Sequence, residues 1–230
     1  MRLGLLGGSF NPIHNCHLSV AAQTRDALNL DRILFVPTGD PPHKDSGSLA
    51  PARHREAMVR LAIGAEPSFE LTDIELRRGG KSYSIDTIRA LQTHLGPEAE
   101  LFFVIGLDAF LDLPSWKEAD RLLRACHFVV VSRPGASFER LATMPLFPPV
   151  DREQLRTLDR GEAHRLTVPV PDGDRLTLLR LAPCLVSASE IRQRIRARRS
   201  VADVLPPPVQ SYIIQHGLYL EDADHTGSQG

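Results

Sequence analysis

GGSFNPIHNCHL, residues 7–18, joins two segments of different pattern. The apolar run Leu3 to Leu6 before it predicts a short buried strand, and residues 19–30 after it predict a helix. The stretch is therefore expected to form a strand-to-helix turn. Gly7 and Gly8 would let backbone N–H groups approach a ligand closely, and the positive end of the following helix would face the same place. We predict that this turn binds phosphate.

Two histidines stand at the helical end of the turn. His14 and His17 are three residues apart, so in a first helical turn both side chains point from one face toward whatever the glycines hold. Satisfied surface histidines are one alternative, and a metal site that includes Cys16 is another. The metal site is disfavoured because Cys16 and His17 are adjacent and point in different directions, and no fourth ligand stands at a usual spacing.

The composition bounds the class of protein. Of 230 residues, 42% are hydrophobic and 24% charged, with a net charge of -1, which offers no general attraction to nucleic acid or to an anionic membrane. We expect one domain over residues 1–220, without a linker, and a disordered tail at 221–230. The three cysteines predict no disulfide framework and favour a reducing, cytoplasmic setting. No signal-peptide segment or membrane span is expected.

Strand and helix patterns alternate along the chain. Strands are expected at residues 32–37, 69–76, 101–105, 128–131 and 175–181, with helices at 51–65, 85–95 and up to Arg198, and a last short helix at 206–215. The fold class predicted is α/β, a Rossmann-like doubly wound parallel sheet with flanking helices and a small C-terminal helical part. Residues 136–174 show no sustained period, so we predict irregular surface structure there and no function.

Polar residues follow several of these strands. In open parallel sheets, ligands lie beyond the carboxyl ends of the strands. Asp108 after Gly106, and Arg133 after the strand at 128–131, are therefore site candidates. Serines cap two expected helices, Ser84 at one and Ser187 at the other, and so leave free N–H groups beside them.

Trp116, the only tryptophan, is by default a core residue, with stacking on a ligand as the alternative. Arg192 lies one turn into the helix that Ser187 caps.

These motifs resemble a known family. GGSFNPIHNCHL resembles GGTFDPIHxGHL, the first signature of the nucleotidylyltransferase superfamily, and SASEIR at 187–192 resembles its second, SSTxIR. The segments VPTGDPPHK, KSYSIDTI, FVIGLDAF with LPSW, and SRPG are similar to those of bacterial nicotinate-nucleotide adenylyltransferases. Among the departures from the signatures, Ser9 and Ser189 replace Thr, Asn11 replaces Asp, and Cys16 replaces Gly.

The resemblance implies transfer of AMP from ATP to nicotinate mononucleotide, with Mg²⁺ bridging phosphate oxygens and no metal cage made by the protein. It implies catalytic roles for His14, His17, Lys44 and Arg192. It implies ATP contacts at Gly7, Gly8, Ser9, Phe10, Gly106, Asp108, Arg133, Ser187, Ser189 and Ile191. The second substrate would meet Tyr83, Ser84 and Trp116. If the usual Gly lets adenine pack on bare backbone, Cys16 narrows that contact.

Two other functions stay open at this point. The acceptor could be another phosphate, on nicotinamide mononucleotide or phosphopantetheine. A nucleotide sensor without turnover is the other alternative, and Cys16 is its only support. A homo-oligomer is compatible with the sequence, which fixes no oligomeric state.

Overall fold

The computed structural model describes residues 1–41, 49–171 and 173–220. Lys44 and the tail at 221–230 therefore lie outside the described residues. The elements in chain order are β1 (Arg2–Gly8), α1 (Asn15–Leu28), β2 (Arg32–Pro37), α2 (Ala52–Ile63), β3 (Phe69–Leu71), α3 (Ile74–Arg78), α4 (Ser84–Leu95), β4 (Glu100–Gly106), α5 (Leu107–Leu111), η2 (Leu113–Ser115), α6 (Ala119–Ala125), β5 (His127–Val131), η3 (Phe138–Thr143), α7 (Arg152–Arg160), β6 (Arg165–Pro169), β7 (Arg175–Leu179), α8 (Ala188–Arg196) and α9 (Pro207–Gln215).

The strands form one seven-stranded sheet in the order β3-β2-β1-β4-β5-β7-β6. Each neighbouring pair is parallel except β6 and β7, which are antiparallel at the edge. β1 lies between β2 and β4, with Leu6 opposite both Phe35 and Val104. The chain leaves β1 toward one face of the sheet and β4 toward the other, so the space between their carboxyl ends is the topological switch point where such folds bind ligands.

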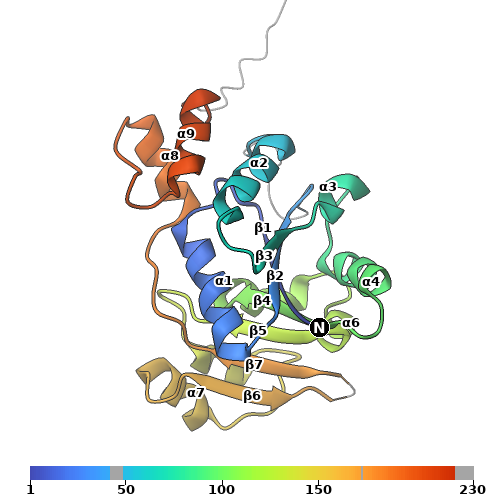
Figure 1. Cartoon of the computed structure of the whole chain (residues 1–230). Coiled ribbons are helices and arrows are strands. Elements are labelled where there is room, and N and C mark those ends of the chain that lie inside the picture. The colour runs from blue at the N-terminus through green and yellow to red at the C-terminus, as the bar shows by residue number, and fades with distance from the viewer. Residues whose placement is uncertain (42–48, 172, 221–230) are drawn as a thin grey trace, which may run out of the picture.

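Helices cover both faces of the sheet (Figure 1). Leu3 and Leu5 of β1 belong to a core shared with α4, α5 and α6, whereas Leu6 belongs to a core shared with α1, α2, α8 and α9. Successive strand residues point to opposite faces, so a strand that is apolar on every residue supplies both cores. The predicted α/β fold class, a doubly wound sheet with flanking helices, is confirmed.

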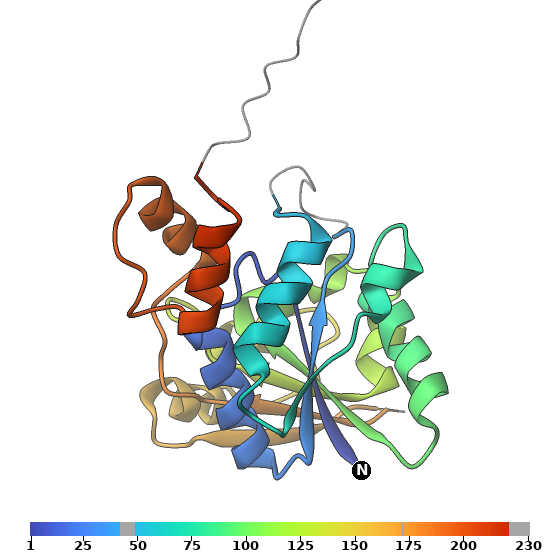
Figure 2. The same cartoon turned by 45° about the horizontal axis from the view of Figure 1, so that its top comes forward.

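The C-terminal helices return to the N-terminal part of the chain. α9 packs beside α2, as Figure 2 shows, and His54 and Tyr212 meet in a 3.0 Å hydrogen bond between the two helices. Ile191 of α8 and Val209 of α9 are fully buried under the sheet face that α1 also covers. The small C-terminal helical part thus belongs to the same core as the first strand.

Several boundaries differ from the prediction. The strand expected at 69–76 is only β3, because Ile74–Arg78 is helical. β7 ends at Leu179, and α4 begins at Ser84, so Tyr83 and not Ser84 is its N-cap. β1 continues through Gly8, so Gly7 and Gly8, predicted to belong to the turn, are the last two residues of the strand and pair with β2. α1 begins at Asn15, inside the opening motif. No helix in the described ranges is long and apolar enough to cross a membrane.

The prediction of irregular structure at residues 136–174 is wrong. This segment contains η3, α7 and the edge strand β6. Leu155 and Leu158, three residues apart on α7, are both fully buried, and Asp151 caps the helix by accepting from the Glu153 N–H at 2.9 Å. Only two apolar positions anchor this short helix, which is why its period was too brief to recognise.

Candidate nucleotide-binding site

A pocket of about 640 Å³ opens at the carboxyl ends of β1, β2, β4 and β5. That volume is in the usual range for a small-molecule site. Of the predicted site residues, the pocket is lined by Gly7, Gly8, Ser9, His17, Tyr83, Ser84, Gly106, Asp108, Trp116 and Arg133. The switch point therefore brings together predicted residues from three separate strand ends, those of β1, β4 and β5, and from the start of α4.

Other predicted residues lie around the pocket without lining it. Phe10 and Ile191 are buried in the core, and His14 lies behind His17. Ser187, Ser189 and Arg192 belong to α8 and its cap, outside the lining of this pocket.

The two histidines of the opening motif have different environments. His14 is 4% exposed, and no group in the described part of the chain forms a hydrogen bond with its Nδ1. Burial, with a smaller contribution from the Arg133 guanidinium, lowers the pKa of His14 to about 4. At neutral pH this imidazole is therefore uncharged, which refines its expected role as a phosphate donor: it can donate an N–H but brings no full charge of its own.

The His17 ring is held by its own helix turn. Its Nδ1 accepts a hydrogen bond from the His14 backbone N–H at 3.2 Å, so a neutral ring carries its proton on Nε2. The Phe10 ring packs edge-on against it with a centroid distance of 5.1 Å, and the His14 ring lies 3.9 Å away. His17 thus presents a donor of fixed orientation in the wall of the pocket.

Gly106 and its neighbours form the second wall. A Cβ built on Gly106 would lie 2.6 Å from Arg133 Nε and 2.6 Å from Asp108 Oδ1, so a side chain here would displace both groups. Arg133 and Asp108 form an exposed ion pair at 3.5 Å. Glycine at the end of β4 therefore lets a cation and a carboxylate stand together at the switch point.

The helix α8 is tied to the opening motif. Ser187 Oγ accepts from the Glu190 N–H at 3.1 Å, which caps the helix, and Arg192 donates to the Asn11 carbonyl at 2.8 Å and to Ser189 Oγ at 3.2 Å. The cap predicted at Ser187 is present. Arg192 joins the two predicted halves of the nucleotide site.

Arg55 is a positioning residue that sequence reasoning missed. It lies on α2, is 2% exposed, and donates to the carbonyls of Ala50 at 3.0 Å, Ser9 at 3.0 Å and Gly39 at 3.3 Å. Burial lowers the pKa of this guanidinium. The sequence carried one signal for a buried arginine: Arg55 lies three residues before Met58, on the same face of the helix. An isolated arginine on a helix is normally exposed to solvent, so this signal did not stand out.

Asn11 and Tyr219 form a further contact of the turn. Asn11 Oδ1 accepts from the Ala50 N–H at 3.0 Å and from the Tyr219 hydroxyl at 2.9 Å. Burial raises the pKa of Tyr219, so the phenol stays a donor. The amide oxygen of Asn11 accepts from two donors, as a carboxylate oxygen of the usual Asp could. Asn11 therefore can form both hydrogen bonds without a negative charge at this buried position.

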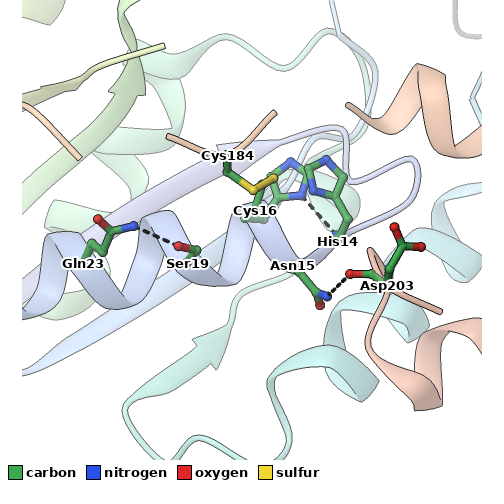
Figure 3. Close-up of a disulfide and its surroundings, with 8 residues drawn as sticks. His14, Asn15, Cys16, Ser19, Gln23, Cys184 and Asp203 are labelled. Atoms are coloured by element: carbon green, nitrogen blue, oxygen red, sulfur yellow. Dashed lines mark hydrogen bonds between the residues drawn. A yellow bond between two sulfur atoms is a disulfide. The ribbon is translucent and has the colours of Figure 1, made fainter. Parts of the chain in front are cut away.

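The sequence predicted no disulfide framework, and the structure contains one disulfide that this prediction did not anticipate. Cys16 and Cys184 form a disulfide with a Cα–Cα distance of 5.6 Å, while Cys126 is a buried free thiol. Figure 3 shows the bond at the start of α1, next to His14. A separation of 168 residues gives no sequence signal for pairing, because only the return of the segment after β7 to α1 brings the two residues together.

Near Trp116 the pocket carries a cation. Lys117 Nζ donates to Asp86 Oδ2 at 2.9 Å and lies 4.7 Å from the centre of the Tyr83 ring. Lys117 and Tyr83 line the pocket, whereas Asp86 does not. Trp116 is half-buried, packs partly on the core and also lines the pocket, so stacking on a ligand stays a prediction.

The fold and the pocket define a nucleotide-binding protein of the doubly wound α/β class. The chain belongs to the cytidylyltransferase-like family, whose sequence model matches residues 5–194. It is 41% identical over 222 residues to a Geobacter metallireducens protein named "Probable nicotinate-nucleotide adenylyltransferase", covering 96% of this chain and 100% of that one. A protein of the same name from Pelobacter propionicus is 43% identical over 225 residues, covering 96% and 99%.

The fold is also that of a solved structure. The Plasmodium falciparum nicotinic acid mononucleotide adenylyltransferase complexed with NaAD superimposes with a TM-score of 0.70 at 20% identity, covering 97% of this chain and 99% of that one. The predicted family resemblance is confirmed.

Proposed function

We propose that the chain transfers AMP from ATP to nicotinate mononucleotide, forming nicotinate adenine dinucleotide and pyrophosphate. The observation that carries the proposal is one pocket that joins the glycine turn and His17 to Tyr83, Ser84 and Trp116 at the switch point of the sheet. Two substrates bound there would meet between the carboxyl ends of β1 and β4. The names of the relatives and the sequence signatures support the same reaction.

The reaction needs alignment and charge stabilisation more than it needs a base. The attacking group is a phosphate oxygen that is already an anion, which bonds to the α-phosphorus of ATP while the bond to the departing pyrophosphate breaks. Holding the two reactants in line supplies much of the rate enhancement, and donors aimed at the leaving group supply more. No proton has to be removed from the acceptor.

Named residues suit these tasks. The Nε2–H of His17 and backbone N–H groups at the end of β1 would donate to the triphosphate, while Arg133 supplies a cation at the same wall. The α8 N-terminus capped by Ser187, together with Arg192, would hold the distal phosphates. Lys44 remains a proposed cation on the basis of its motif.

The acceptor end is suited to a carboxylate. Backbone N–H groups at the start of α4, beside Tyr83 and Ser84, would receive the nicotinate carboxylate, and Trp116 would stack on the pyridine ring. Lys117, which is ion-paired with Asp86, lies in the same wall. These features predict a preference for nicotinate over the neutral nicotinamide.

Mg²⁺ fits this pocket as an ion carried by the substrate. Asp108 and Asp112 are exposed carboxylates in the lining, and the described residues contain no group of three or more side chains that would cage a metal. An ion bound mainly by phosphate oxygens and water would have these two residues as available protein donors, and it would neutralise charge on the leaving pyrophosphate.

We place the reaction in the cytoplasm, where ATP is made and used.

Pyrophosphate release from ATP tests the proposal. Nicotinate mononucleotide, nicotinamide mononucleotide and phosphopantetheine are offered in turn, with ATP alone as the control. We expect rapid release with the first and a catalytic efficiency at least about tenfold lower with the second. Equal efficiencies would contradict the carboxylate site, and ATP binding without release for any acceptor would indicate a sensor.

A further inference from the structure

We propose that Cys16 and Cys184 are a redox modification site, and that forming their disulfide tightens ATP binding. The inference rests on the proposed function, since it concerns the ATP half of that site. The oxidant is a low-molecular-weight disulfide that reacts by thiol–disulfide exchange.

The two sulfurs join the two segments that carry the predicted phosphate ligands. Cys16 lies in the first turn of α1, adjacent to His17, and lines the pocket. Cys184 lies between β7 and α8, three residues before the Ser187 cap. A bond between them therefore sets how far the α8 N-terminus can move from the histidines.

The segment around Cys184 has few other restraints. This segment, residues 182–186, starts at Ala182, whose N–H donates a hydrogen bond to Gln23 Oε1 at 2.8 Å. From 183 to 186, the disulfide is the only covalent cross-link or hydrogen bond to the rest of the described chain. Without it, the peptide that leads into α8 keeps only its packing, and ordering it on ATP binding costs conformational entropy.

The disulfide leaves the pocket open. The volume of about 640 Å³ is present with the bond formed, and Cys184 is not part of its lining. Oxidation is therefore expected to preorganise the ATP site and not to obstruct it. The proposed redox role also explains why this chain has Cys16 at the position where the family motif has Gly.

Of the two cysteines, Cys184 is the one that a small disulfide can reach for thiol–disulfide exchange. Cys16 is 2% exposed, whereas Cys184 is half-buried beside Leu185, which is 80% exposed. We therefore assign the first attack to the Cys184 thiolate, which bonds to one sulfur of the external disulfide and expels its other half as a thiol. The Cys16 thiolate then attacks Cys184 Sγ in the mixed disulfide and expels the second thiol. The two cysteine protons end on the two released thiols, and the external disulfide is reduced as the pair is oxidised.

Cys126 provides an internal control. It is 3% exposed, and burial raises the pKa of its thiol to about 12, so it is not expected to react. Stable disulfides are rare in the cytoplasm, where those that form are typically transient and redox-sensing.

The test compares the enzyme equilibrated with oxidised glutathione and with dithiothreitol. Thiols are counted after denaturation, the Kd for a non-hydrolysable ATP analogue is measured by calorimetry, and KM values come from pyrophosphate release. We expect one thiol in the oxidised enzyme and three in the reduced enzyme. Reduction should raise the Kd and the KM for ATP by about threefold to tenfold, with the KM for nicotinate mononucleotide changed less than about twofold.

Two variants complete the test. Cys184→Ser should bind the analogue as the reduced enzyme does in both buffers, and Cys126→Ser should keep the full response. Three thiols in both buffers, an unchanged Kd, or tighter binding after reduction would each overturn the proposal. Because thiol counts and analogue binding need no acceptor, they still decide the redox proposal if no acceptor supports turnover, which would refute only the proposed function.

Discussion

Replacing Arg55 by Met should destabilise the protein and loosen the opening turn. Its guanidinium is 2% exposed and donates to three carbonyls, those of Ser9, Gly39 and Ala50. Methionine fills much of the volume but leaves all three acceptors without these donors. A net loss of about 1 to 1.5 kcal/mol for each of the three hydrogen bonds gives a decrease of about 3 to 4.5 kcal/mol in the free energy of unfolding.

The assay is thermal unfolding followed by circular dichroism. For a domain of this size, about 3 to 4.5 kcal/mol corresponds to a Tm lower by about 10 °C. Arg53→Met is the matched control, because Arg53 is two residues earlier on the same helix and is exposed. It should change the free energy of unfolding by less than about 0.5 kcal/mol. Equal Tm values for the two variants would refute the assignment of Arg55 as the residue that holds these three loops.

Three further predictions concern the pocket. His17→Ala should lower turnover by about a hundredfold with the fold intact, as for loss of one preorganised donor, and near-normal steady-state turnover would remove this residue from the mechanism. The pKa of His14 is about 4 in the folded protein and 6.5 for an ordinary histidine. Between pH 4 and pH 6.5 the unfolded chain therefore binds more protons at His14 than the folded protein does. Acidifying from pH 6.5 to 4 should lower the free energy of unfolding by up to about 3 kcal/mol through His14. Urea titrations should show a shallower decrease for His14→Gln, and an identical pH dependence would contradict the neutral buried imidazole. Trp116→Ala should raise the KM for nicotinate mononucleotide about tenfold with little change in the KM for ATP, whereas an equal rise in both would argue against stacking on the acceptor.

The sequence predicted the features that depend on local pattern. The predicted change from an apolar strand to a helix placed His17 correctly in a first helical turn, although Gly7 and Gly8 end the strand and do not form the turn. Gly106 with Asp108 and Arg133 indeed stands at the ends of neighbouring strands. Period and strand-end rules suffice for these residues because each one is set by its own element.

Features that depend on distant segments were missed. Arg55 is buried only because three loops direct carbonyls at it, and a helical pattern cannot reveal where those loops go. The pairing of Cys16 with Cys184 likewise depends on how the segment after β7 returns to α1. Between residues 136 and 174, each element is too short for its periodicity to stand above the turn residues around it.

The 168-residue separation of the disulfide also bears on the order of events during synthesis. β1 and α1 emerge from the ribosome first, and Cys184 follows only after the residues of all seven strands have been made. Cys16 therefore stays an unpaired thiol for most of translation. The covalent link closes a loop from the first helix to the segment before α8, so the two halves of the proposed nucleotide site can be joined only after Cys184 has been made.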